Sequence, residues 1–289
     1  MNTVLITGTS SGFGYLTTLE LLQSGATVYA SMRELEKKNK EKAKKLEQVA
    51  QSLNGVLYLI DMDVTDEKSI RNVKSKIEEN GHTIDVLINN AGLGCKGIME
   101  SFTTQQHKNI FEVNYFGVIN VTNVFLPHLR SNKGRIINIS SLSGRISGAF
   151  NGPYAASKFA LEAYTTSLRA ELIPLGLQVG VVEPGIFNTE MQQKFQTGSN
   201  EAVLESYGPV VEFMKAQDAA FAQMMMAGIP GPEMVSQTIG QLVSAEVLPQ
   251  RTVVDYLVKD FVEKLNKAED DVNLEIQQFL QSLATQQEA

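Results

Sequence analysis

Short apolar segments alternate with longer segments of helical periodicity along most of the chain. Seven of the short segments have the Val, Ile and Leu density of strands that are covered on both faces. These predicted strands are Thr3–Thr7, Thr27–Ser31, Val56–Asp61, Val86–Asn89, Gly134–Ile139, Gln178–Val182 and Thr252–Tyr256. The helical windows between them include Tyr15–Ser24, Lys68–Asn80, Thr104–Leu129 and Tyr154–Leu175. This alternation predicts βαβ units, and therefore an α/β fold with a parallel sheet.

The alternation stops at Met191. Residues 191–232 are polar and Met-rich and are interrupted by Gly and Pro, so we expect a C-terminal insertion that covers the substrate over the open side of the sheet. Residues 261–289 are predicted to form a polar helical tail with a thin apolar stripe. This tail could pack on a partner subunit or be partly disordered, but we favour a loose surface helix. Residues 1–260 are then expected to form a single domain.

Composition excludes several classes of protein. The chain has 289 residues, of which 43% are hydrophobic, enough for a sizeable core, and a net charge of −7 with no basic run that carries interleaved aromatic residues. We therefore expect no nucleic-acid partner. The single cysteine, Cys95, excludes an internal disulfide. The chain begins directly in a predicted strand and has no apolar run of membrane-spanning length, so we expect a cytoplasmic protein without a signal peptide or an integral membrane segment.

A glycine-rich segment, Thr7–Gly14 (TGTSSGFG), connects the first predicted strand to the first predicted helix. Its glycines allow a sharp turn that brings backbone N–H groups against an anion, and the helix directs its positive dipole end to the same place. The spacing meets the common G-x-G-x-x-G pattern only loosely. The segment predicts a phosphate cradle made by Gly8, Ser10, Ser11, Gly12, Phe13 and Gly14.

The same segment also satisfies G-x-S-x-G, the nucleophile elbow of serine hydrolases. A hydrolase would need a general-base histidine later in the chain. The three histidines are His82, His107 and His128, so the second half of the chain contains none. They also lack metal-ligand spacing with one another or with Cys95, so no metal is predicted. Cys95 itself is either a reactive thiol or, more simply, a small buried filler.

Tyr154 and Lys158 lie four residues apart at the start of a predicted helix, so both project from one face. A nearby ammonium group, together with an oxidised nicotinamide ring, would favour the phenolate and lower the pKa of the tyrosine. Such a pair can act as a general acid/base without histidine or metal. By itself, a Tyr-x-x-x-Lys pair is also common on helix surfaces by chance.

Four motifs in this order resemble the short-chain dehydrogenase/reductase family: TGxxxGxG, Asn89-Asn90-Ala91-Gly92, Tyr154-x-x-x-Lys158 and Pro184-Gly185. The resemblance is close over residues 1–190 and loose over 191–260. It implies a doubly wound, Rossmann-like fold with a seven-stranded parallel sheet, whose ligands lie at the carboxyl ends of the strands. It also implies a homodimer or homotetramer that pairs through the long helices.

The resemblance implies a role for each matching residue. Tyr154 is the catalytic acid/base, and Lys158 holds the nicotinamide ribose and tunes the tyrosine. Ser141, in preference to its neighbour Ser140, hydrogen-bonds the substrate oxygen. Asn114 completes a water-linked proton relay, although it could equally serve to kink its helix. The other implied cofactor contacts are Asp63 and Val64 at the adenine ring, Asn90, Ala91 and Gly92 along the adenine ribose, Pro184 and Gly185, and Thr189 at the carboxamide.

The end of the second predicted strand indicates which dinucleotide binds. An NAD enzyme usually has an acidic residue there for the ribose 2′-hydroxyl, whereas this chain has Met32 followed by Arg33. An arginine can bind a 2′-phosphate in a bidentate manner, and Glu34 is expected to face solvent. We predict NADP(H) over NAD(H). The stretch Val28–Arg33 also resembles the branch that contains hydroxysteroid and retinol dehydrogenases.

These observations predict an NADP(H)-dependent oxidoreductase that transfers hydride between nicotinamide and a small-molecule alcohol/carbonyl substrate, which we expect to be apolar. A second hypothesis is an NADP(H)-binding protein that senses redox state without turnover. A third is a lyase, epimerase or dehydratase on the same scaffold, which would show no net consumption of cofactor.

Overall fold

The computed structural model describes residues 2–287. The seven predicted strands form one parallel sheet of order β3-β2-β1-β4-β6-β7-β9. Its strands are β1 (Thr3–Thr7), β2 (Thr27–Met32), β3 (Val56–Asp61), β4 (Val86–Asn89), β6 (Arg135–Ile139), β7 (Gln178–Pro184) and β9 (Arg251–Val254). The chain runs outward from β1 to β3, then returns to the other side of β1 and continues from β4 to β9. This reversal confirms the doubly wound fold, and it opens a crevice at the carboxyl ends of β1 and β4.

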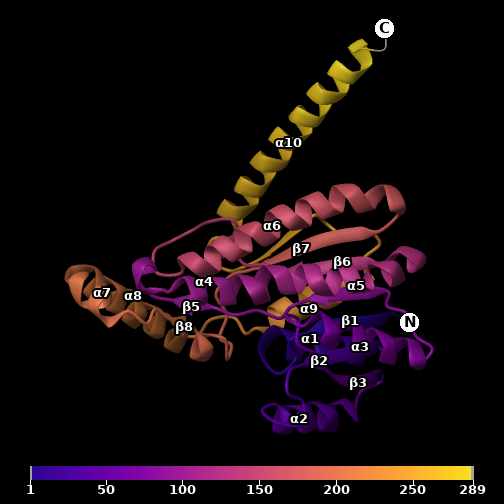
Figure 1. The fold of residues 1–289 in the computed structure, drawn as a ribbon, viewed down its shortest axis with the longest axis horizontal. Helices are drawn as coiled ribbons and strands as arrows, with labels where there is room; N and C mark the ends of the chain where they lie inside the picture. The colour runs from indigo at the N-terminus through magenta and orange to yellow at the C-terminus, as the bar shows by residue number, and fades with distance from the viewer. Residues whose placement is uncertain (1, 288–289) are drawn as a thin grey trace.

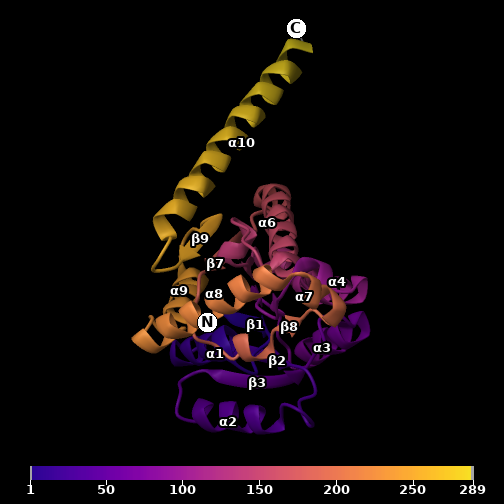
Figure 2. The same ribbon diagram turned by 90° about the vertical axis from the view of Figure 1, so that its left-hand side faces the viewer.

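Helices cover both faces of the sheet. One face carries α1 (Gly12–Gln23), α2 (Lys40–Ala50) and α9 (Glu233–Ser244), and the other carries α3 (Glu67–Glu79), α5 (Gly117–Asn132) and α6 (Gly152–Leu172). Figure 2 shows the strands between α1 and α9 on one side and α3 and α6 on the other. Because both faces are covered, the strands bury apolar side chains in both directions, which explains their nearly continuous hydrophobic sequence.

The predicted helix 104–129 is not continuous. It forms α4 (Thr104–Phe111), a π-helical turn η2 (Glu112–Phe116) and α5. The extra residue in a π turn displaces the chain locally, and such turns are frequent at functional sites. Here the turn contains the fully buried Asn114. By contrast, the predicted window Tyr154–Leu175 forms α6 followed by one short turn, η4 (Ile173–Leu175).

Segment 191–232 contains η5 (Gln192–Lys194), β8 (Gln196–Thr197), α7 (Glu201–Ser206) and α8 (Gly208–Ala227). β8 pairs with β5 (Cys95–Lys96), which ties this segment to the chain that follows β4. Figure 1 shows α7, α8, β5 and β8 gathered at one end of the molecule. Two short turns, η1 (Met99–Ser101) and η3 (Leu142–Gly144), complete the elements outside the sheet and its helices.

The chain ends in a long helix, α10 (Lys259–Gln287), which leaves the body of the molecule (Figures 1 and 2). Its first turns are anchored, since Val262 and Asn266 are buried, whereas Phe279 further along is 60% exposed. The predicted tail 261–289 is thus helical as far as it is described, and residues 288 and 289 lie outside the described residues. Among residues 2–287 no helix combines the length and the apolar character that a membrane span requires.

Candidate active site

The glycine-rich turn has the geometry that a phosphate cradle needs. Gly8 and Gly12 have φ angles of +74° and +60°, which L side chains rarely adopt. A Cβ on Gly8 would lie only 2.8 Å from Ala91 Cα, so the turn and the chain after β4 could not approach so closely. Ser11 precedes α1 without capping it through its side chain, which leaves the first-turn amides available to an anion.

A cavity of about 220 Å³ lies at this turn, along the crevice of the sheet. Of the predicted cofactor residues, those that line it are Gly8, Ser10, Ser11, Gly12, Phe13, Arg33, Asp63, Val64, Asn90, Ala91, Gly92 and Thr189. Tyr154, Lys158, Pro184 and Gly185 instead line a second, adjacent cavity of about 430 Å³. Gly14 lines neither, because its Cα packs against Asn90 and the Gly8 carbonyl, where a Cβ would clash at 2.4 Å.

The two cavities form one elongated cleft, since several residues line both: Phe13, Asn90, Gly92, Thr189 and Met191. The cleft runs from a glycine cradle at a helix N-terminus to the buried Lys158 and the half-buried Tyr154. Its residues fit a dinucleotide, with a pyrophosphate at the cradle and a nicotinamide towards Lys158.

Three polar residues that were not predicted from the sequence also line the first cavity, and two of them are cations. Lys38 and Asn39 lie there with Arg33, and Lys194 reaches it from the 191–232 segment. Lys38 belongs to the polar run directly after Arg33, and its place in that run could have indicated a second cation at the same site. Lys194 carries no motif, and only the folded chain brings its Nζ to 3.3 Å from Ser11 Oγ.

Arg33 and Asp63 come together in the structure, with 3.5 Å between Arg33 Nη1 and Asp63 Oδ2. Burial opposes ionisation of Asp63, but hydrogen bonds from Thr65 and the charge of Arg33 hold its pKa below the usual value. The Arg33 side chain is 53% exposed, so this pair is weak and the guanidinium stays accessible to a ligand. Asp61, at the end of β3, uses both carboxylate oxygens to accept the amides of Glu34 and Leu35.

Lys158 is buried at the floor of the cleft. Its Nζ donates a hydrogen bond to the Ile139 carbonyl at 2.8 Å and lies 5.8 Å from the centroid of the Tyr154 ring. Burial lowers the pKa of Lys158 to about 8, although the charge of Glu162 opposes the change. The ammonium form is thus still favoured at neutral pH, but by much less than for an exposed lysine.

Burial raises the pKa of Tyr154, while a hydrogen bond with Ser141 lowers it. Burial is the largest of these effects, because a phenolate is costly to move away from water. The lowered pKa expected from the sequence concerns the tyrosine beside an oxidised nicotinamide ring, and it stays a prediction. Ser141 Oγ also accepts the Ser143 amide at 3.1 Å. Ser140 instead packs beside Gly144, whose Cβ position lies 2.7 Å from Ser140 Oγ, and Ser141 is the serine that hydrogen-bonds the tyrosine.

Asn114 is held by backbone groups of Leu93. Its Oδ1 accepts the Leu93 amide at 2.7 Å, and its Nδ2 donates to the Leu93 carbonyl at 2.9 Å and to Ser157 Oγ at 3.0 Å. A Cβ on Gly92 would lie 3.4 Å from Asn114 Oδ1 and 3.8 Å from Lys158 Nζ. The structure therefore brings Asn114 and Lys158 together beside Gly92.

The larger cavity is lined by Ser141, Tyr154 and Lys158, by five phenylalanines and by several other polar side chains. The phenylalanines are Phe13, Phe150, Phe187, Phe195 and Phe221. Helix α8 contributes Gln217, Asp218 and Phe221, and an ion pair between Lys96 and Asp218 connects it to β5. Cys95 is almost completely buried in the wall, and burial raises the pKa of its thiol to about 11, so it is not poised as a thiolate.

No histidine lines either cavity. His82 hydrogen-bonds the Tyr29 hydroxyl at 2.7 Å, and His128 contacts Glu78 at 3.0 Å, both among the helices that cover the sheet. The serine-hydrolase interpretation of Gly8–Gly12 is therefore unsupported, because Ser10 and Ser11 have no general base in the cleft.

Comparison with known proteins agrees with this geometry. A family model described as short chain dehydrogenase matches residues 2–200. The chain is 33% identical over 261 residues to 3-ketodihydrosphingosine reductase of Bacteroides thetaiotaomicron, covering 89% of this chain and 88% of that protein. It is 34% identical over 246 residues to NADPH-dependent 1-acyldihydroxyacetone phosphate reductase of Schizosaccharomyces pombe, covering 78% and 79%.

A third relative is matched over less of its length: mouse retinol dehydrogenase 5, 39% identical over 191 residues, with 64% of this chain and 57% of that protein covered. Among solved structures, a short-chain dehydrogenase from Streptomyces avermitilis superposes with a TM-score of 0.71 at 29% identity, covering 96% of both chains. The chain therefore belongs to the short-chain dehydrogenase family and is a nicotinamide-dependent oxidoreductase that acts on CH–OH groups.

Proposed function

We propose that this protein uses NADPH to reduce the carbonyl group of an apolar substrate, and oxidises the matching alcohol in the reverse direction. One observation carries the proposal. Tyr154, Ser141 and Lys158 together line a cavity that is also lined by five phenylalanines and that continues into the dinucleotide cleft. The named relatives with the longest matches, the two reductases, act by their names on carbonyl groups of lipids.

The bound nicotinamide would supply the hydride to the carbonyl carbon. The Ser141 hydroxyl donates a hydrogen bond to the carbonyl oxygen and stabilises the negative charge that develops there. The Tyr154 phenol then gives its proton to that oxygen, so hydride and proton together complete the alcohol. Lys158 holds the ribose and stabilises the phenolate that remains. Asn114 and Lys158, which both lie beside Gly92, are positioned to return a proton to the tyrosine through water.

The raised pKa of Tyr154 suits the proton-donating role that carbonyl reduction requires. Because burial raises its pKa, the phenol keeps the proton that a carbonyl reduction needs. Oxidation of an alcohol needs the phenolate, which becomes accessible only as the pH rises or as positive charge enters the cleft.

The preference for NADPH rests on the charges at the rim. Arg33 and Lys38 offer two cations, whereas Asp61 accepts two backbone amides and does not line the cavity. A 2′-phosphate gains from such cations, whereas a 2′-hydroxyl needs an acceptor. The Schizosaccharomyces pombe relative is named as NADPH-dependent. The sequence of β2 supports assignment to the hydroxysteroid and retinol dehydrogenase branch.

Residues 191–232 act in this proposal as the substrate-covering part of a single domain formed by residues 1–260. Helix α8 supplies one wall of the larger cavity, and the Lys96–Asp218 pair fastens it to β5. We also propose a homodimer or homotetramer, because Phe116 and Phe159 are exposed on the helices expected to pair.

The test is NADPH oxidation by the purified protein with a panel of long-chain 3-keto lipids, steroids, retinal and quinones, and NADH in parallel. Tyr154→Phe should lose turnover by about 10²–10⁴-fold while still binding NADPH, because only the proton donor is removed. Tyr164→Phe is the matched control, since this tyrosine lies on the same helix but lines neither cavity.

Three results would count against the proposal. Equal turnover in Tyr154→Phe would remove the tyrosine from the reaction. Equal kcat/KM with NADH and NADPH would contradict the cofactor preference. Tight NADPH binding with no turnover on any carbonyl would favour the redox-sensing hypothesis.

A further inference from the structure

A group of buried charged side chains lies directly behind the catalytic helix face. Glu162 follows Lys158 by one helical turn on α6, and Glu183 precedes Pro184 at the end of β7. The side chains of Glu162 and Glu183 are 3% and 0% exposed. Two buried carboxylates so close to a catalytic lysine are costly unless they are compensated, and nothing in the reaction described above uses them.

Two guanidinium groups face these carboxylates. Arg251 of β9 places Nε 3.6 Å from Glu162 Oε2 and 3.7 Å from Glu183 Oε1. Arg145, after η3, places Nε 3.9 Å from Glu183 Oε1. These ion pairs are long, because both arginines make their shorter contacts with other side chains.

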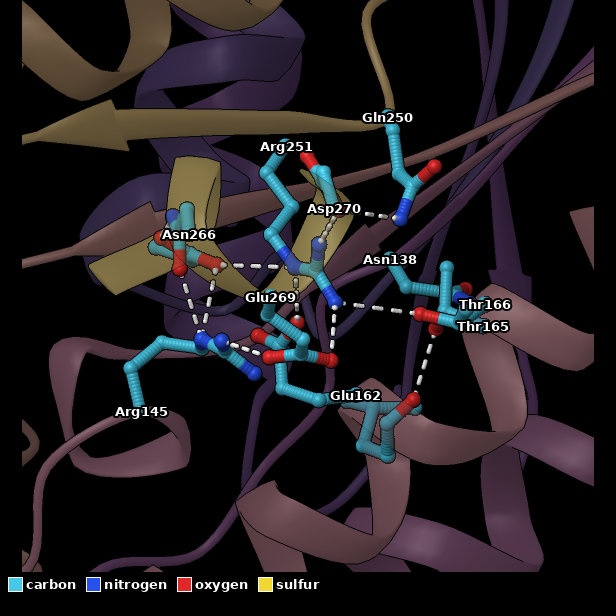
Figure 3. A network of polar contacts seen from close by, with 12 residues as sticks. Asn138, Arg145, Glu162, Thr165, Thr166, Gln250, Arg251, Asn266, Glu269 and Asp270 are labelled. Atoms are coloured by element: carbon cyan, nitrogen blue, oxygen red, sulfur yellow. Dashed lines mark hydrogen bonds and ion pairs between the residues drawn. The ribbon is translucent and has the colours of Figure 1, made fainter. Parts of the chain in front are cut away.

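The shorter contacts come from the base of α10. Glu269 binds both Arg145 and Arg251, and Asp270 lies 2.5 Å from Arg251 Nη1 (Figure 3). Asn266 donates to Glu183 Oε2 at 2.7 Å and accepts from Arg145 Nε at 2.6 Å. Four carboxylates (Glu162, Glu183, Glu269 and Asp270) therefore share two guanidiniums, and the group carries excess negative charge.

The excess negative charge affects Glu162, which lies on the same helix as Tyr154 and Lys158. Burial and the charge of Glu183 raise the pKa of Glu162 to about 7, while Ser140 and the two arginines oppose the change. Gly144 shows how closely the groups pack: its Cβ position lies 3.1 Å from Glu162 Cγ and 3.2 Å from the Lys158 carbonyl. Only a glycine fits there, so no side chain separates Glu162 from the turn that carries Lys158.

We propose that Glu162 is a positioning residue for Lys158, because the negative charge of Glu162 keeps the lysine ammonium charged. In this proposal the base of α10 determines how much of the Glu162 charge is left unpaired. Burial alone disfavours the ammonium, and Glu162 is the group on α6 that opposes this loss. Glu269 and Asp270 hold the arginines that would otherwise neutralise Glu162. The inference rests on the proposed function only for the role of Lys158 in turnover.

The first experiment measures the pH dependence of NADPH binding by fluorescence and, where turnover is found, of kcat. In Glu162→Gln the alkaline limb, where Lys158 loses its proton, should move to lower pH by about one unit, because an opposing charge has been removed. Glu171→Gln, an exposed glutamate on the same helix, should leave the limb in place. If the alkaline limb lies at the same pH in the two variants, the proposal is overturned.

The second experiment is an infrared titration of the ligand-free protein. A protonated-carboxyl band that titrates near neutral pH is expected from the Glu162/Glu183 pair, and Glu162→Gln should lose it. Glu269→Gln should move its midpoint to lower pH, because one repelling charge is removed and the arginines are released to the pair. Glu269→Gln therefore still tests the proposal if Glu162→Gln does not fold. An unmoved midpoint would refute the role of α10.

The two proposals can fail separately. A shifted NADPH-binding limb in Glu162→Gln, with no turnover by any variant, would support this inference and contradict the proposed reductase.

Discussion

Replacing Arg251 with Gln tests how much stability depends on the charges behind the active site. The Arg251 side chain is 4% exposed, and its guanidinium faces Glu162, Glu183, Glu269 and Asp270. The substitution leaves Arg145 as the one guanidinium of the group. Breaking a buried ion pair from one side typically costs about 3–5 kcal/mol, because the remaining charge stays buried without compensation. We expect a loss in this range at pH 8.

The loss should depend on pH in a defined direction. The pKa of Glu162 in the folded protein, about 7, already lies above its ordinary value of 4.5, and removing Arg251 raises it further. A group with a raised folded pKa contributes stability below its unfolded pKa and loses that contribution as the pH rises through the folded pKa. The difference between variant and wild type should therefore be smaller at pH 5.5 than at pH 8.

The assay is urea unfolding followed by circular dichroism at pH 5.5, 7 and 8, with m-values compared to confirm that the same surface is exposed. Arg71→Gln is the control, because Arg71 pairs with Glu67 on the exposed face of α3. Such an exposed i,i+4 pair contributes only about 0.3–0.5 kcal/mol. A loss below about 1 kcal/mol for Arg251→Gln at pH 8, or an equal loss at all three pH values, would refute the reasoning.

Two further predictions concern the cleft. Gly8→Ala should weaken NADPH binding by at least about tenfold and destabilise the fold by about 1–3 kcal/mol, because the new Cβ meets Ala91 Cα at 2.8 Å and the φ of +74° is strained for alanine. Fluorescence titration and thermal unfolding measure both effects; Gly148→Ala, at a position with no atom within 4 Å, is the control, and wild-type affinity in Gly8→Ala would contradict the cradle. Cys95 should react with iodoacetamide at pH 8 about 100-fold more slowly than a free thiol, since its pKa is about 11 and it is buried. Mass spectrometry of the labelled protein follows the reaction, and rapid labelling of the native state would show that the wall around Cys95 opens.

Local patterns predicted much of this protein. The strands were predicted because a β-strand covered on both faces must be apolar along a few consecutive residues, and that signal needs no knowledge of the rest of the chain. The cradle was predicted for a similar reason: Gly8 and Gly12 adopt their positive φ angles within a single turn. Tyr154 and Lys158 lie on one helix face by their spacing alone.

The π turn at Asn114 was not visible as a break in the helical pattern. The periodicity of residues 104–129 is helical throughout, and the turn is stabilised by hydrogen bonds to Leu93, which lies in another segment. The effect of burial on the pKa of Tyr154 was also not visible in the sequence, because it depends on how the folded chain surrounds the phenol. Lys194 reaches Ser11 only because the segment after β7 folds back over the cradle.

The sequence by itself determined the class of fold and the positions of the strands along the chain, and it predicted Tyr154 and Lys158 as the acid/base pair, since each depends on residues close together in the chain. The tertiary structure alone decided the group of charges formed by Arg145, Glu162, Glu183 and Arg251 with the base of α10. These residues come from a loop, a helix, two strands and the C-terminal helix, and each one by itself resembles an ordinary surface charge. Their burial, and hence their influence on Lys158, arises only when the sheet brings β7 and β9 together and α10 covers them.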